Sequence, residues 1–103
     1  MAEQQRPIPQ IIAIPWYRRA DYPSVLAVMV DAERLPPTFD RWQKRAQSIE
    51  AERQASGLTT FRAYLDPQQF VAWCAATNRN VDAQARIDWA NAAAFEHWRD
   101  QNR

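Results

Sequence analysis

Glycine, cysteine, histidine and lysine are almost absent from this chain of 103 residues, since each occurs only once. A glycine-rich phosphate loop or a dinucleotide fingerprint needs several positions without a Cβ atom, so Gly57 alone excludes both. Cys74 alone excludes a disulfide framework, and one cysteine with one histidine falls short of a structural zinc site. The sequence therefore predicts no bound cofactor and no metal site.

An excess of one charge and long apolar runs are missing as well. The net charge is +1, far from the strongly basic balance that is typical of nucleic-acid-binding proteins. No apolar run approaches the length that crosses a bilayer, and residues 1–10 lack the apolar core of a signal peptide. These absences favour a cytoplasmic protein that does not contact membranes.

Large apolar side chains are what the chain has in abundance. Hydrophobic residues make up 47% of it, with five Trp, four Phe and three Tyr. Each ring can bury about 150–250 Å², and a chain of this length buries roughly two-thirds of its unfolded surface. We therefore expect one α+β domain over residues 8–103, preceded by a disordered tail over residues 1–7.

Helix breakers and apolar periodicity divide this domain into six elements. Strands are predicted near residues 10–14 and over 58–65. Helices are predicted over residues 22–35, 39–55, 67–77 and from 83 nearly to the C-terminus. The predicted order is β-α-α-β-α-α. Two strands alone are marginal in water, so we expect helices to cover the small sheet and dimerisation to extend it.

Polar residues at the expected helix ends fit capping better than catalysis. Thr38, Asp66 and Asp82 each precede a helix, where a side-chain oxygen can accept from a first-turn amide. Pro67 fits the first helical position after Asp66. Gly57 follows the second helix, where a left-handed residue is favoured. These residues are therefore assigned to the fold rather than to a site.

The fourth helix is predicted to have two apolar faces. The main face repeats at three- and four-residue spacing and consists of Ala83, Ile87, Ala90, Ala94 and Trp98. A second patch, made of Ala85, Trp89 and Ala93, lies on another side of the helix at about 100° per residue. That patch is either covered within the domain or an interface, because exposed Trp is enriched in contact surfaces.

Four short motifs after Pro15 combine aromatic residues with arginine, aspartate or proline. They are WYRR at 16–19, DY at 21–22, LPPTFDRW at 35–42 and DPQQFVAWC at 66–74. Together they resemble a set of short uncharacterised bacterial proteins that share a domain of unknown function. The resemblance implies no activity, and it assigns no functional residue.

Cys74 and His97 are the side chains from which a thiol–imidazole pair would have to come. Cys74 falls on the apolar stripe of the third helix, where a thiol acts as a small hydrophobic group and keeps a high pKa. His97 lies near a helix end, where an imidazole suits the helix dipole. We expect no catalytic residue and no enzymatic activity.

A basic patch is the second candidate site. Its residues are Arg18, Arg19, Arg41, Lys44 and Arg45, with aromatic side chains nearby, as nucleic-acid surfaces often have. A strand followed by two helices is also the order of a ribbon-helix-helix protein. The first strand, however, lacks the alternating polar side chains that would read bases. A solvated helix face therefore explains these charges better.

Three functions follow from this pattern. The preferred one is a small non-catalytic interaction protein that forms a homo-oligomer or binds a protein partner. Its interface would use Ile12 of the first strand and the patch of Ala85, Trp89 and Ala93. The alternatives are a nucleic-acid-binding accessory protein, and a small-molecule binder or enzyme with an aromatic pocket.

Overall fold

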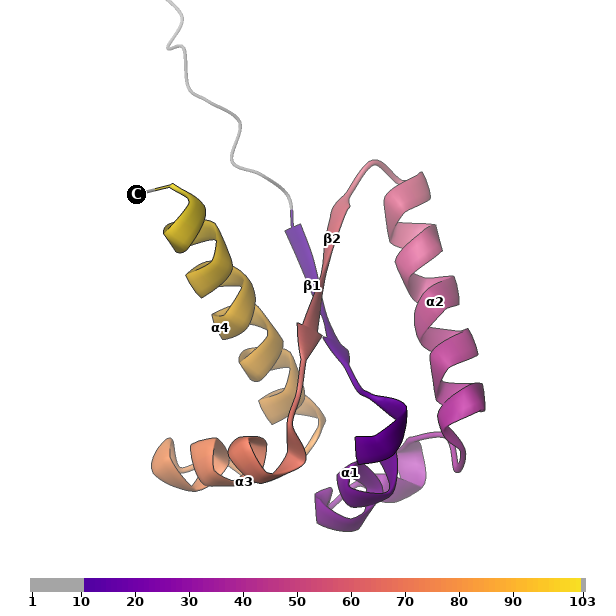
Figure 1. Ribbon diagram of the computed structural model, residues 1–103, viewed down its shortest axis with the longest axis vertical. Coiled ribbons are helices and arrows are strands. Elements are labelled where there is room, and N and C mark those ends of the chain that lie inside the picture. The colour runs from indigo at the N-terminus through magenta and orange to yellow at the C-terminus, as the bar shows by residue number, and fades with distance from the viewer. Residues whose placement is uncertain (1–10, 103) are drawn as a thin grey trace, which may run out of the picture.

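A computed structural model describes residues 11–102 of the chain (Figure 1). Its strands are β1 (Ile11–Trp16) and β2 (Thr59–Tyr64), and its helices are α1 (Tyr22–Val28), α2 (Phe39–Ala55), α3 (Pro67–Ala76) and α4 (Ala83–Gln101). Short 3₁₀ turns lie at η1 (Arg19–Asp21) and η2 (Ala32–Arg34). The order β-α-α-β-α-α and the α+β class are confirmed. The tail predicted over residues 1–7 lies outside the described residues.

The two strands pair in parallel, with Ile11 opposite Thr59 and Trp16 opposite Tyr64. A parallel pair needs a crossover connection, which α1 and α2 provide. Figure 1 shows both strands between α2 on one side and α4 on the other. The Trp16 ring meets α2, whereas the ring of Phe61 meets His97 of α4 at 4.9 Å. The sheet is therefore the middle layer of three.

The helix caps predicted from the sequence are confirmed. Thr38, Asp66 and Asp82 each accept from the amide three residues further on, at donor–acceptor distances of 3.3, 3.0 and 3.0 Å respectively. Gly57 has a φ of +88°, the left-handed conformation that ends α2. Local sequence therefore fixes where three of the helices begin.

The first helix is shorter than predicted. It ends at Val28, and Met29 takes an extended conformation with a ψ of 132°. The change of direction lets the Val30 amide donate to the Val81 carbonyl at 2.9 Å, which ties this segment to the loop before α4. A contact between distant segments has thus overridden the local helical pattern.

The predicted main face of α4 is only partly buried. Ala90 of that face is buried, whereas Ile87 and Trp98 are exposed, and Ala85 of the second patch is buried as well. The reason is that α3 packs beside α4: the ring of Trp89 meets that of Phe70 edge-on, at a centroid distance of 5.6 Å. The helix is rotated so that the predicted second patch faces the protein and part of the main face does not.

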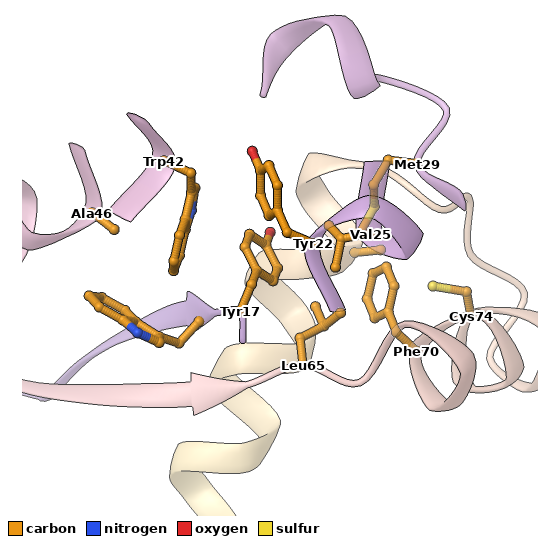
Figure 2. Packing of buried hydrophobic residues seen from close by; sticks show 11 residues of the cluster. Tyr17, Tyr22, Val25, Met29, Trp42, Ala46, Leu65, Phe70 and Cys74 are labelled. Atoms are coloured by element: carbon orange, nitrogen blue, oxygen red, sulfur yellow. The ribbon is translucent and has the colours of Figure 1, made fainter. Parts of the chain in front are cut away.

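Aromatic rings form the centre of the core (Figure 2). The ring of Trp42 lies 5.1 Å from Trp16, 4.8 Å from Tyr17 and 6.1 Å from Tyr22, measured between centroids. Figure 2 shows the cluster continuing through Leu65 toward α3. The core therefore joins α2, β1 and α1 at the carboxyl end of the sheet.

None of the helices within residues 11–102 has the length and apolar character needed to span a bilayer.

Candidate functional site

The outer edge of β1 has no neighbouring strand within residues 11–102. The Trp16 carbonyl accepts from the Leu65 amide at 2.9 Å, so the backbone groups of Trp16 face β2. Backbone groups of successive residues point to opposite sides of a strand, so those of Ile11, Ala13 and Pro15 face outward. Pro15 has no amide hydrogen and costs no ladder bond there. Within the described part of the chain, no backbone carbonyl pairs with the amides of Ile11 and Ala13 on this edge.

Exposed apolar side chains border this edge on both sides. On α4, Ile87 is 49% exposed and Trp98 is 41% exposed, and the Trp98 ring lies 6.3 Å from that of Phe95. At about 100° per residue, Ile87 and Trp98 share the side of α4 that carries Ala83, which lines a cavity beside β1. Ile49 of α2 is also exposed and lines that cavity. The edge therefore lies between two apolar borders.

The cavity lies at the carboxyl end of the same edge and has a volume of about 330 Å³. We call it the β1 cavity. Four parts of the chain form its walls: β1, the segment around η2, α2 and the start of α4. The lining residues include Ile14, Tyr17, Leu35 and Trp42. Segments that are distant in sequence thus enclose one space with a mainly apolar floor.

A buried ion pair forms one wall of the β1 cavity. Arg86 donates to both carboxylate oxygens of Asp31, at 2.8 and 3.1 Å, and also to the Met29 sulfur at 3.4 Å. The hydrogen bonds from Arg86 lower the pKa of Asp31, against the opposing effect of burial. The pair therefore stays charged at neutral pH and holds η2 against α4.

Tyr17 is buried beside this pair. Its side chain is 3% exposed and lines the β1 cavity, yet no residue within 11–102 hydrogen-bonds to its hydroxyl. Burial raises the pKa of Tyr17 to about 12, and the positive charge of Arg86 offsets only part of this effect. The hydroxyl therefore stays protonated, as a hydrogen-bond donor without a partner in the described chain.

Alkaline pH is expected to destabilise the fold through Tyr17. Folding raises the pKa of Tyr17 from 10.0 to about 12. The contribution of Tyr17 to the free energy of unfolding is therefore complete below pH 10 and is lost as the pH rises toward 12. A shift of this size corresponds to about 3 kcal/mol of unfolding free energy. Urea unfolding of the protein and of Tyr17→Phe across this range checks the prediction, since the variant should lose less. An equal loss in both proteins would contradict it.

The interface residues predicted from the sequence occupy different environments. Ile12 is half-buried in β1. Trp89 is half-buried against the ring of Trp73 at 5.5 Å, and Ala93 lines a small cavity with these two rings. Ala85 is buried within the chain's own core and is not available to a partner. The helix patch thus packs mainly on α3.

Trp89 occupies one carbonyl on the outer edge of β2. Its indole N–H donates to the Tyr64 carbonyl at 3.2 Å. That carbonyl faces away from β1, because the neighbouring Leu65 amide bonds to β1. The Arg62 side chain lies over the ring of Trp16 at 4.0 Å and pairs with Glu50 of α2, so it covers the α2 face of the sheet and not this edge. The two edges of the sheet therefore differ at the Tyr64 carbonyl, which α4 occupies.

The predicted basic residues do not share one environment. They are Arg18, Arg19, Arg41, Lys44 and Arg45. Arg19 pairs with Asp40 at 2.7 Å, and Arg18 lies over the ring of Tyr64 at 5.5 Å. The three on α2 are exposed, and of these Arg45 lines the β1 cavity. Arg18 and Arg45 therefore line two separate cavities.

Cys74 and His97 are not brought together by the described contacts. Cys74 is fully buried, and burial raises the pKa of its thiol, as expected for a structural cysteine. His97 is exposed and packs its ring on Phe61. No group of three or more His, Cys, Asp or Glu side chains in residues 11–102 could hold a metal ion.

The fold and the site define a small α+β protein with a two-stranded parallel sheet, neither edge of which has a further strand within residues 11–102. Comparisons of the chain with protein-family models, with curated proteins and with solved structures each found no match. The open edge of β1, its two apolar borders and the β1 cavity are the features of this protein that could bind a partner or a ligand.

Proposed function

We propose that this protein is a small interaction protein that self-associates through the outer edge of β1. The observation that carries the proposal is the open pair of amides at Ile11 and Ala13, bordered by exposed apolar residues on α4 and α2. A two-stranded sheet is marginal in water, and parallel sheets in general are covered and extended. A second copy of β1 would supply the missing neighbour.

An antiparallel pairing of two β1 strands, centred on Ala13, suits the chemistry of this edge. The Ala13 residues would exchange amide–carbonyl bonds, and each Ile11 amide would meet a Pro15 carbonyl of the other copy. The missing amide of Pro15 then costs only bonds at the ends of the ladder. The result would be a four-stranded sheet with two-fold symmetry, the commonest symmetry of soluble oligomers.

The apolar borders support the same arrangement. A two-fold axis perpendicular to the sheet places both copies of α4 on one face, next to the axis. The exposed side of α4, with Ile87, Phe95 and Trp98, would then meet its equivalent. Burial of apolar area contributes about 25 cal/mol per Å², which favours closure of this face. The proposed contact on α4 therefore uses Ile87 and Trp98 instead of Trp89.

Ile87→Glu is expected to convert a dimer into a monomer. The substitution places a charge in the proposed α4 contact, and it leaves the core intact because Ile87 is half exposed. Sedimentation velocity at about micromolar to millimolar concentrations measures the mass. Ala13→Pro should act in the same direction, because it removes an outward amide without breaking a bond to β2.

Ala92→Glu is the matched control, since Ala92 is exposed on α4 about 140° away from Ile87. It should stay dimeric. A parent protein that is monomeric throughout the concentration range would refute the proposal. Dissociation by Ala92→Glu as readily as by Ile87→Glu would move the interface away from β1.

A further inference from the structure

We propose that the β1 cavity binds a small organic acid, a compound with one apolar ring and one carboxylate group. This proposal goes beyond self-association and does not depend on it. Three features of the cavity support it: its size and apolar walls, its uncompensated positive charge, and the hydroxyl of Tyr17, which has no hydrogen-bond partner within residues 11–102.

The size of the β1 cavity fits one ring with short substituents. Its volume of about 330 Å³ is that of roughly ten water molecules, and it stands at the lower end of the range for ligand pockets. Ile14, Leu35, Trp42 and Ile49 supply apolar wall on different sides. Trp42 is 6% exposed but lines the cavity, so part of its indole can contact an aromatic ring.

The charges around the β1 cavity favour an anion. Three arginines and one aspartate line it, and Asp31 compensates only Arg86. Arg34 and Arg45 are exposed, and neither has an ion-pair partner within residues 11–102. They come from η2 and α2, so they approach the cavity from two elements. A guanidinium group matches a carboxylate with two parallel hydrogen bonds.

Tyr17 supplies a polar contact deeper in the cavity. Its side chain is 3% exposed and lines the cavity, and no residue within 11–102 hydrogen-bonds to its hydroxyl. The hydroxyl oxygen is itself accessible, because the described residues include no buried side-chain oxygen without a partner. A ligand oxygen in the cavity can therefore accept from this hydroxyl. The ligand is expected to carry an acceptor on the ring, opposite its carboxylate.

The three features set the orientation of the ligand. The carboxylate lies at the rim with Arg34 and Arg45, where solvent also reaches it. The ring packs on Trp42, and the ring acceptor meets Tyr17. The proposed dimer uses outward backbone groups of Ile11, Ala13 and Pro15, and Pro15 also lines the cavity, so the two surfaces adjoin at that residue.

Isothermal titration calorimetry with para-hydroxybenzoate tests the proposal. We expect binding that is at least about tenfold tighter than that of para-hydroxybenzamide, its uncharged analogue. Arg45→Gln should weaken the acid by about tenfold and leave the amide unchanged. Arg41→Gln is the matched control on α2, because Arg41 is exposed but does not line the cavity, and it should bind as the parent does.

Tyr17→Phe tests the deeper contact. It should weaken para-hydroxybenzoate by about fivefold and leave benzoate, which lacks the acceptor, unchanged. Should this core variant unfold, the comparison of Arg45→Gln with Arg41→Gln still decides the proposal. No binding of the acid at about 10 mM, or equal affinity for acid and amide, would overturn it.

The same titration on Ile87→Glu separates this proposal from self-association. Binding that persists in a monomeric Ile87→Glu supports a small ligand in the cavity of each chain. Loss of binding on dissociation would show that a second copy completes the cavity, and would overturn a site built by one chain. Binding by a parent protein that is monomeric would support the ligand site and refute only the dimer.

Discussion

Replacing Trp42 with alanine is expected to lower the free energy of unfolding by about 3–5 kcal/mol. The Trp42 ring is buried and lies within about 6 Å, between centroids, of Trp16, Tyr17, Tyr22 and Phe39. Its removal leaves a cavity between α2 and the sheet that these rings cannot fill. A domain of this length has about 5–15 kcal/mol of stability in total, so the variant would be marginal.

Urea unfolding followed by circular dichroism measures this loss. Trp42→Phe keeps a ring in the cluster and should lose clearly less. Ile49→Ala removes an exposed apolar side chain from the same helix and should change the free energy by less than about 1 kcal/mol. A loss of that smaller size in Trp42→Ala would show that the aromatic cluster is not the centre of stability.

Arg86→Met is expected to cost about 3–5 kcal/mol, because it leaves the Asp31 carboxylate without its partner in a mostly buried position. The double variant Arg86→Met with Asp31→Leu should recover most of that loss, since an apolar pair of similar volume needs no compensation of charge. Urea unfolding of the parent, both single variants and the double variant gives the coupling energy. Additive losses would contradict the pairing.

The ion pair also predicts how stability depends on acid. Arg86 lowers the pKa of Asp31 in the folded state. The contribution of Asp31 is therefore present above its unfolded pKa of about 3.9 and is lost as the pH falls through the lower folded value. Between about pH 5 and pH 2, the parent should lose more stability than Arg86→Met. If Arg86→Met loses as much stability in acid as the parent does, the pKa shift of Asp31 is not the cause of that loss.

Features that depend on neighbouring residues could be predicted from the sequence. Asp66 and Pro67 set the start of α3, and Gly57 sets the end of α2, because capping and left-handed backbone need only local chemistry. The alternation along β2 also needs only local information, and the structure places Ala63 and Leu65 inside with Tyr64 outside, as predicted.

Features that depend on contacts between distant segments could not be predicted. Arg86 and Asp31 are 55 residues apart, and each looks like a surface charge in its own helix or turn. The direction of the strands depends on the crossover, which short sequence patterns do not report. The rotation of α4 depends on α3, because Trp89 reads as an exposed patch until Trp73 is placed beside it.

The hydrogen bond from the Trp89 indole to the Tyr64 carbonyl bears on how far assembly can proceed. A sheet with two free edges can add strands at both edges and grow into fibres. The Trp89 bond occupies the last outward carbonyl of β2, so a strand that approached this edge would lose one pairing group. Pairing would therefore favour β1 and give a closed two-fold particle. Truncation of Trp89 would free that carbonyl, and slow growth of filaments would be the hazard of losing one indole.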